Sequence, residues 1–409
     1  MNMKRLPLLL TLGLLLGGTG LEAQEIKTYF VEEEVPAFTL PDALVLNNGK
    51  RVRNRRVWEK KRRPEILEVF AQEMYGHIPA RPEGLHFETV SVDTVYGGLG
   101  LRKVVRLFLD ASGEHWFDVL VHTPRNIEGP VPFFVGLNFK SNEATLDGRG
   151  SASWPYEMIL GAGFGVATAW RDSVEPDGPG SQVKERKDTV CQDGGVRAWY
   201  NRGGDWGAIS AWAWGLSRIM DYLETDPAAD ASRVAVLGHS RLGKTALWAG
   251  ANDSRFAGVI SNCSGCCGAA ISRRVFGENF AAIDTTFPYW FTREFDKYRF
   301  HEDQFPGDQH WLAALAAPRP LYVVSASKDG WADPKGEWLC AKSVEPVYRL
   351  YRYKGLTSSR FDASVQPDPD CPVCDGRVAY HLREGKHAIT PFDWAQYIAF
   401  MRRELCGGK

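Results

Sequence analysis

The sequence predicts an α/β protein with a doubly wound, mostly parallel sheet, on three observations. Short apolar runs rich in Val, Phe and Ile alternate with helical stretches over more than half of the chain. Gly, Pro or Asn bounds these runs, as is typical of strands that are covered on both faces. The chain has 409 residues, 44% of them hydrophobic, which suffices for a large buried core and excludes a disordered chain or a small disulfide scaffold.

The expected elements follow from these patterns. Residues 24–60 are polar and interrupted by prolines, and the basic run 50–63 is expected to be a solvated helix face. Apolar residues recur at helical spacing in 207–224 and 242–251, and a last helix is expected at 391–405. The expected strands are 117–122, 132–138, 163–169, 233–238, 257–262 and 320–327.

Two long stretches, 174–205 and 354–377, are loop-like, and loops of that length often shape a binding cleft. No internal repeat or low-complexity linker divides the chain. Residues 24–409 are therefore expected to form one domain with an N-terminal extension.

The first 23 residues have the pattern of a secretory signal peptide. Lys4 and Arg5 precede a mostly apolar run at 8–16, and Ala23 offers a small residue for cleavage. The run is too short to span a bilayer, and no Cys follows it that could carry a lipid anchor. The mature protein is therefore expected to be secreted or periplasmic.

The charge of the chain is nearly balanced, with 49 Lys and Arg against 50 Asp and Glu. Proteins that bind nucleic acids or acidic membranes usually carry a basic surplus. Neither kind of partner is expected, and the protein is expected to be a monomer.

The strongest motif is Gly238-His-Ser240-Arg241-Leu-Gly243, between an expected strand and an expected helix. This resembles the nucleophile elbow of α/β-hydrolases, a three-layer fold, with the second Gly displaced by one position. A tight turn built from small residues lifts the serine hydroxyl above the sheet. The backbone N–H of Arg241 then points toward a developing oxyanion. Ser240 is therefore the candidate nucleophile.

A serine nucleophile needs a base, and the base needs an acid that orients it. In this fold the chain order is Ser, acid, His. Asp329 follows the strand 320–327, and His387 lies on a loop before the last helix. Asp333 is the poorer acid because Asp-Pro often starts a turn, and His381, between apolar neighbours, is expected to be packed. We expect Asp329, rather than Asp333, to reach the imidazole nitrogen that faces away from Ser240.

Two cations accompany the proposed nucleophile. Lys244 lies one helical turn beyond Ser240, roughly on the same side as Arg241. Such charges are costly unless they meet an anion. The anion is either a carboxylate of the protein or a substrate carboxylate, and Arg241 could also stabilise the oxyanion.

These residues resemble the glucuronoyl esterases of carbohydrate esterase family 15, from about residue 42 to the C-terminus. The Ser-Arg-x-Gly-Lys element is distinctive among α/β-hydrolases. The resemblance rests on segments 239–244, 264–270, 277–278, 287–291, 331–337 and 385–394. It implies hydrolysis, without cofactor or metal, of the ester that joins (4-O-methyl-)glucuronic acid of xylan to lignin alcohols.

The resemblance also implies roles for individual residues. Ser240 resembles the family nucleophile, His387 its general base, and Arg241 the residue that assists the oxyanion. The residues that resemble those holding or flanking the uronate are Lys244, Glu278 and Trp331. Trp290 either lines the cleft or packs in the core.

Many family members place the triad Glu where this chain has Cys263, so the acid must come from elsewhere. Asp329 resembles the acid of some bacterial members.

The eight cysteines all lie beyond residue 190, and export would allow them to pair. Cys371 and Cys374 lack a second Cys pair and a nearby His cluster, so a loop disulfide is expected there rather than a metal site. Cys263, Cys266 or Cys267 is expected to join a bridge beside the active site, with Cys340 as a candidate partner.

Two other functions are compatible with the sequence. One is an acetyl-xylan esterase or another carbohydrate esterase on the same fold. The other is a non-catalytic carbohydrate-binding protein, which the 14 Trp residues and the missing Glu at position 263 suggest.

Overall fold

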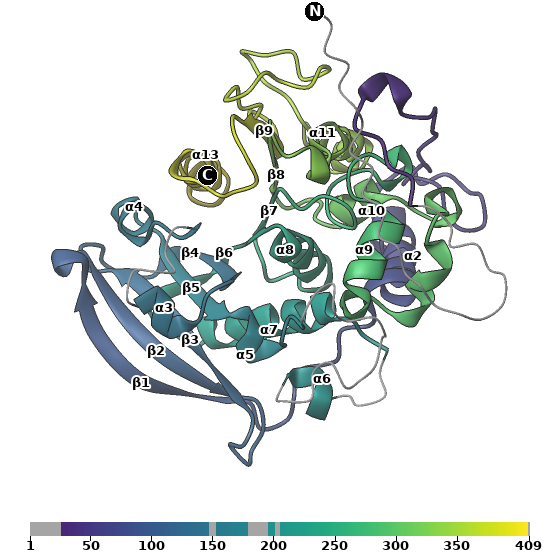
Figure 1. The fold of residues 1–409 in the computed structure, drawn as a ribbon. Coiled ribbons are helices and arrows are strands. Elements are labelled where there is room, and N and C mark those ends of the chain that lie inside the picture. Colours follow the sequence, from purple (N-terminus) through teal and green to yellow (C-terminus); the bar gives the residue numbers. More distant parts are fainter. Residues whose placement is uncertain (1–25, 147–152, 179–194, 201–204, 408–409) are drawn as a thin grey trace, which may run out of the picture.

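The computed structural model describes residues 26–146, 153–178, 195–200 and 205–407. A nine-stranded sheet runs through this part of the chain in the order β1-β2-β3-β5-β4-β6-β7-β8-β9 (Figure 1). Neighbours from β5 through β4 to β9 are parallel, whereas β1 to β3 and the β3–β5 pair are antiparallel. The predicted α/β class with a mostly parallel sheet is confirmed.

Each of the six expected strands is present within a few residues of its expected position. A further strand of the parallel part, β9, contains His381. The sequence did not predict β1 and β2, because β1 has no buried residue and β2 has only three, so neither has the pattern of a strand covered on both faces. The strands are β1 (His86–Val95), β2 (Gly100–Phe108), β3 (Trp116–Pro124), β4 (Val131–Asn138), β5 (Gly165–Trp170), β6 (Ala229–His239), β7 (Gly258–Asn262), β8 (Leu321–Ala326) and β9 (Val378–Arg383).

Helices cover both faces of the parallel part of the sheet and bury two apolar layers. Alternate strand residues belong to different layers, so Val166 packs with α4 and α13 while Ala167 packs with α7 and α8. The α-helices of the described chain are α1 (Arg55–Val57), α2 (Arg63–Phe70), α3 (Asn142–Leu146), α4 (Tyr156–Gly161), α5 (Arg171–Val174), α6 (Val196–Trp199), α7 (Ala208–Leu223), α8 (Arg241–Asn252), α9 (Phe280–Thr286), α10 (Gln309–Ala314), α11 (Pro334–Ser343), α12 (Glu345–Leu350) and α13 (Pro391–Met401).

The expected helices at 207–224, 242–251 and 391–405 correspond to α7, α8 and α13. All sixteen residues of α7 are buried because the helix lies between the sheet and other segments of the chain. Among the described residues no helix is both long and apolar enough to cross a membrane. The segment 1–23 lies outside the described residues.

The basic run 50–63 is only partly a solvated face. Arg62 is buried, and its guanidinium lies 4.1 Å from the centre of the Trp311 ring. Its Nε donates to the carbonyl oxygen of Ala43, and its Nη1 donates to Asn47 and Glu65. The expectation for this residue was wrong, because a guanidinium with this many acceptors can be buried at little cost.

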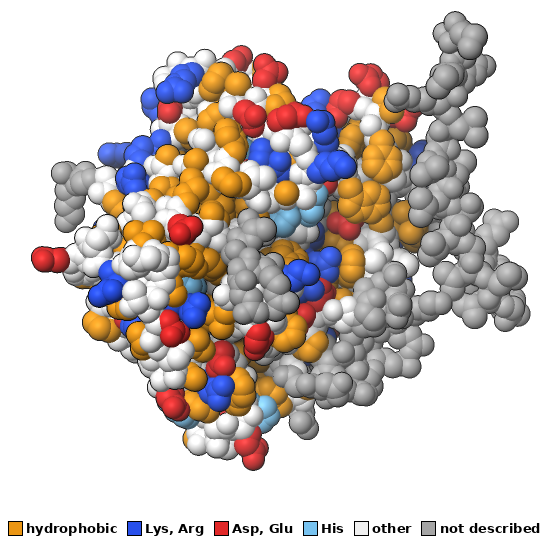
Figure 2. All heavy atoms as spheres, turned by 60° about the vertical axis from the view of Figure 1, so that its left-hand side comes forward, with side chains coloured by type: hydrophobic (Ala, Val, Ile, Leu, Met, Phe, Trp, Pro, Cys, Tyr) orange, Lys and Arg blue, Asp and Glu red, His pale blue; other side chains and the backbone are white. Residues whose placement is uncertain are grey.

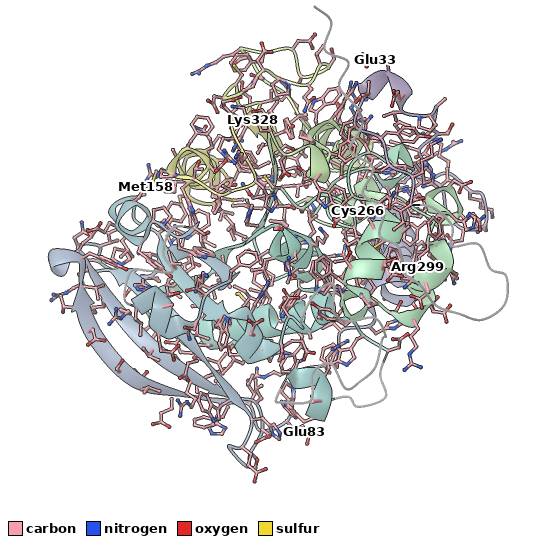
Figure 3. The ribbon with its side chains drawn as sticks, viewed as in Figure 1. Glu33, Glu83, Met158, Cys266, Arg299 and Lys328 are labelled. Carbon is pink, nitrogen blue, oxygen red and sulfur yellow. The ribbon has the colours of Figure 1, made fainter. Side chains whose placement is uncertain are left out.

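The expected disulfides are not formed among the described cysteines, and Cys191 lies outside the described residues. All seven described cysteines are free thiols. The sulfur atoms of Cys266 and Cys267 are 3.8 Å apart, against about 2.0 Å in a disulfide. Cys263 and Cys340 are buried as well, so these thiols act as small apolar core residues. Figure 3 shows Cys266 in the interior, among the helices on one side of the sheet.

Candidate active site

The candidate residues follow the carboxyl ends of neighbouring parallel strands. Ser240 comes directly after β6, Cys263 after β7, Asp329 after β8, and His387 after β9. Because parallel strands end at the same edge of a sheet, this topology brings together residues that are far apart in the chain.

Ser240 has the strained backbone that a nucleophile elbow requires. Its φ is 57° and its ψ is −129°, and its N–H donates to the carbonyl oxygen of Asn262 over 2.9 Å. A side chain at Gly238 would place a Cβ 1.8 Å from the carbonyl oxygen of Leu242. The glycine therefore allows the turn between β6 and α8 to close.

His387 and Asp329 are in direct contact, as the sequence predicted. The Nδ1 atom of His387 lies 2.5 Å from Oδ2 of Asp329, so the imidazole N–H donates to a buried carboxylate. The ring of His239, next to Ser240 in the chain, lies 4.4 Å from the ring of His387. Burial and the neighbouring His387 lower the pKa of His239 to about 4, so that His239 is neutral near pH 7. The contact between the two rings places His387 beside the turn that carries Ser240.

The two competing residues have structural roles in this fold. Asp333 caps α11 by accepting from the N–H of Gly336, and it also accepts from Arg274. His381 is fully buried, with its ring nitrogens at Asp393 and at the hydroxyl of Tyr322. Both therefore occupy the places that the sequence suggested, a turn and a packed core.

Arg241 meets a carboxylate of the protein that the sequence did not single out. Its Nη1 donates to Oδ2 of Asp177, and the Nη1 of Arg171 lies 2.6 Å from the same oxygen. The hydroxyl of Tyr289 and the indole N–H of Trp290 donate to Oδ1 over 2.7 and 2.9 Å. Asp177 lies in a long loop without a motif, so only its contacts identify it.

Trp290 is buried and packs against the side chain of Arg241 rather than lining an open cleft. Only 2% of it is exposed, and its ring stacks on Phe287 with the centroids 3.9 Å apart. The guanidinium carbon of Arg241 lies 4.6 Å from the centre of the Trp290 ring. This cation–π contact and the pair with Asp177 fix the guanidinium close to the nucleophile.

Lys244, Glu278 and Trp331 form a second group beside the elbow. The Nζ of Lys244 lies 3.9 Å from Oε2 of Glu278 and donates to the carbonyl oxygen of Ser264. Burial raises the pKa of Glu278, although Lys244, a hydrogen bond from the Trp331 side chain, Arg241 and His387 act in the opposite direction. Both cations thus have an anionic partner within the protein, while Trp331 reaches the surface with 49% exposed.

A buried carboxyl that the sequence did not single out, Glu337, lies beneath the site. Its Oε1 accepts from the N–H of Gly265 and the hydroxyl of Ser264, and its Oε2 lies 2.7 Å from the hydroxyl of Ser325. Burial is the main cause that raises the pKa of Glu337 to about 8, with Asp329 acting in the same direction. Glu337 thereby holds the backbone at Ser264, whose carbonyl oxygen accepts the hydrogen bond from Lys244.

Replacing Glu337 with Gln is expected to change how stability depends on pH. The pKa of Glu337 is raised from an ordinary 4.5 to about 8, so the folded protein holds a proton that the unfolded chain releases. The stability gained in this way is present below pH 4.5 and is lost as the pH rises to about 8. The Tm of the wild type minus that of Glu337→Gln should therefore fall between pH 5 and 8 and stay level above it. A difference that is constant across this range would contradict the assignment.

The site also contains three groups of the kind that bind metals. A sulfur, an oxygen and a nitrogen of Cys263, Asp329 and His387 lie within 4.8 Å of one another. Burial raises the pKa of Cys263 well above its ordinary value, so the thiol keeps its proton, and the hydrogen bond to Asp329 occupies Nδ1 of His387. This donor set suits an oriented catalytic imidazole better than a metal centre.

The site opens to solvent at His387, of whose side chain 41% is exposed. Figure 2 shows histidine atoms at the surface near the centre of the view, between hydrophobic and basic side chains. Behind His239 lies a cavity of about 170 Å³, whose lining includes Asn138, Trp154 and Ile389. The cavity thus adjoins the elbow at Gly238 and His239.

Comparisons with known proteins agree on one group of enzymes. A family model described as glucuronyl esterase of fungi matches residues 162–351. A carbohydrate esterase, MZ0003, of an unknown prokaryotic organism is 40% identical, and the match covers 92% of each chain. A 4-O-methyl-glucuronoyl methylesterase of Schizophyllum commune is 29% identical over 76% of this chain and 72% of that one. The structure of a glucuronoyl esterase from Solibacter usitatus is 41% identical and superposes with a TM-score of 0.82, covering 91% of this chain and 99% of that chain.

Proposed function

The chain belongs to the glucuronoyl esterases of carbohydrate esterase family 15, and on this basis we propose that it hydrolyses esters of 4-O-methyl-glucuronic acid. It is a carboxylic ester hydrolase. The observation that carries the proposal is the contact of His387 with the buried Asp329, beside the strained Ser240. In the cell wall, we propose, the ester joins the glucuronic acid of xylan to lignin alcohols.

The proposed reaction is an acyl transfer in two steps. His387, oriented by Asp329, takes the proton of the Ser240 hydroxyl as its oxygen attacks the ester carbonyl. The tetrahedral intermediate collapses, the carbon–oxygen bond to the alcohol breaks, and the alcohol leaves with the proton from His387. Water then attacks the acyl-enzyme with His387 again as base, which releases the uronic acid and restores Ser240.

The oxyanion would lie at the start of α8. The backbone N–H of Arg241 is one of the free donors at this helix end, and its guanidinium adds a fixed positive charge. Asp177 and the Trp290 ring hold that charge in place, so it costs little reorganisation during the reaction. Lys244, Glu278 and Trp331, in this proposal, bind the sugar.

Arg241→Ala keeps the backbone N–H but removes the guanidinium, and it is expected to lower kcat by a factor of about 10²–10³, the usual cost of losing one group that stabilises the oxyanion. Asp333→Asn should have a far smaller effect, because Asn also caps helices and Asp333 lies outside the catalytic group. The two variants are to be compared in kcat on one glucuronate ester. Equal losses would refute the roles proposed for Arg241 and Asp333.

Two substrates test the proposed function. The wild-type enzyme should hydrolyse benzyl glucuronate and leave acetylated xylan largely intact, since Lys244, Glu278 and Trp331 would bind the uronate sugar on the acyl side of the ester. Preferential release of acetate would instead support an acetyl-xylan esterase.

We also propose that the protein is exported. The pattern of residues 1–23 supports this, and the substrates are large polymers outside the cell.

A further inference from the structure

Two aromatic side chains lie exposed at the rim of the site. Phe30 is 55% exposed and Trp331 is 49% exposed, large fractions for apolar groups of this size. Their ring centroids are 6.3 Å apart and their planes differ by 22°. Two exposed, nearly parallel aromatic rings therefore neighbour each other here. We call this pair the rim platform.

Phe30 is held in this position by a short segment, residues 27–31, which we call the N-terminal strap. The N–H of Tyr29 donates to the carbonyl oxygen of Val275, and the N–H of Gly277 donates to that of Tyr29. The side chain of Asn279 donates to the carbonyl oxygen of Lys27. Phe30 therefore projects from a strap that is fixed on both sides.

Ion pairs of Glu32, the residue that follows the strap, fix its C-terminal end. Glu32 pairs with Arg274 and with Lys335 over 2.8 and 2.7 Å. Figure 3 labels Glu33, in the turn that follows the strap, and Lys328, just beyond β8, both in the upper part of the view. The rim platform therefore combines two residues, Phe30 and Trp331, that are some 300 positions apart in the chain.

The platform is continuous with the polar groups beside the nucleophile. The N–H of Glu278 donates to the carbonyl oxygen of Trp331 over 2.8 Å, and the Trp331 side chain acts to lower the pKa of the Glu278 carboxyl. Glu278 in turn faces Lys244, one turn of α8 from Ser240. The order outward from the nucleophile is therefore Lys244, Glu278, Trp331 and Phe30.

We propose that Phe30 extends the sugar-binding site and packs against the neutral glycan chain that carries the uronic acid. This inference rests on the proposed function. A pyranose ring has apolar C–H faces and polar edges, which match an aromatic surface beside charged hydrogen-bonding groups. An aryl alcohol has few hydroxyl groups and would make little use of Glu278 and Lys244. The glycan, rather than the leaving alcohol, is therefore the ligand assigned to the platform.

Phe30→Ala tests this with two substrates of different length. On methyl glucuronate, which would reach Trp331 but end before Phe30, KM and kcat should stay near those of the wild type. On the same ester carried by a xylo-oligosaccharide, KM should rise roughly 3- to 10-fold, in line with the loss of one aromatic contact. Phe30→Tyr should keep the wild-type KM on both substrates.

Val31→Ala is the matched control. Val31 is also exposed on the strap, but its backbone is extended, so its side chain points away from that of Phe30. It should not change KM on either substrate. Equal changes on both substrates for Phe30→Ala, or none on either, would overturn the proposal while leaving the esterase assignment intact. A rise in KM for benzyl but not methyl glucuronate would overturn it in favour of the alcohol. A wild-type protein inactive on every glucuronate ester would instead refute the proposed function.

Discussion

Ser240→Ala is expected to lower kcat by a factor of about 10⁶, the loss found when a triad nucleophile is removed. The elbow fixes this serine between β6 and α8, and alanine cannot form the acyl-enzyme. The measurement is single-turnover hydrolysis of benzyl glucuronate, because a covalent intermediate is formed in the first step.

The control for this variant is its stability. Alanine tolerates a φ of 57° about as poorly as serine, so the Tm should change by no more than a few degrees. Binding of the uronic acid product should persist. Turnover that survives the substitution would refute Ser240 as the nucleophile. A wild-type protein that binds glycans but hydrolyses no ester would favour a carbohydrate-binding protein.

Asp329→Asn is expected to lower kcat by about 10³–10⁴, because an amide at this position favours the wrong tautomer of His387. KM should change little, since Asp329 touches the imidazole rather than the substrate. The pH profile of kcat is measured alongside, as a purely structural defect would lower activity without changing its shape.

A substitution at Cys263 tests the role of the Asp329 carboxylate more stringently. Its sulfur lies within 4.8 Å of the ligand atoms of both Asp329 and His387. Adding Cys263→Glu to Asp329→Asn should recover at least tenfold of the lost kcat, because a carboxylate would again face the imidazole. The single variant Cys263→Ala should retain most activity. If the double variant stays as slow as Asp329→Asn, the carboxylate at position 263 does not reach the base.

The parts of the site that could be predicted from sequence are those with local signatures. The turn at Ser240 needs glycines at fixed spacing, since a Cβ at Gly238 would clash with the backbone of α8. The places of Asp329 and His387 follow from strand order, because parallel strands share one edge. Trp331 and Glu278 were found only through the family resemblance.

The parts that could not be predicted depend on contacts between distant segments. Asp177 pairs with Arg241 across 64 positions, and Glu337 meets Gly265 across 72. Neither residue has a local pattern that separates it from an ordinary surface acid. The expected disulfides are absent among the described cysteines for another reason. Export would permit disulfides, but four of the described thiols, Cys263, Cys266, Cys267 and Cys340, are buried as small apolar core residues and are satisfied without pairing.

Strand β1 gives the molecule an open sheet edge, and this bears on its behaviour at high concentration. An outer strand of ten residues has a row of unpaired backbone N–H and C=O groups. A strand of a second molecule could pair with this row and extend the sheet. The ladder slips between Thr89 and Ser91, which breaks the regular array of donors and acceptors. The exposed Glu88 and Asp93 would bring like charges together if two such edges met. These features should oppose edge-to-edge pairing of two molecules at high concentration.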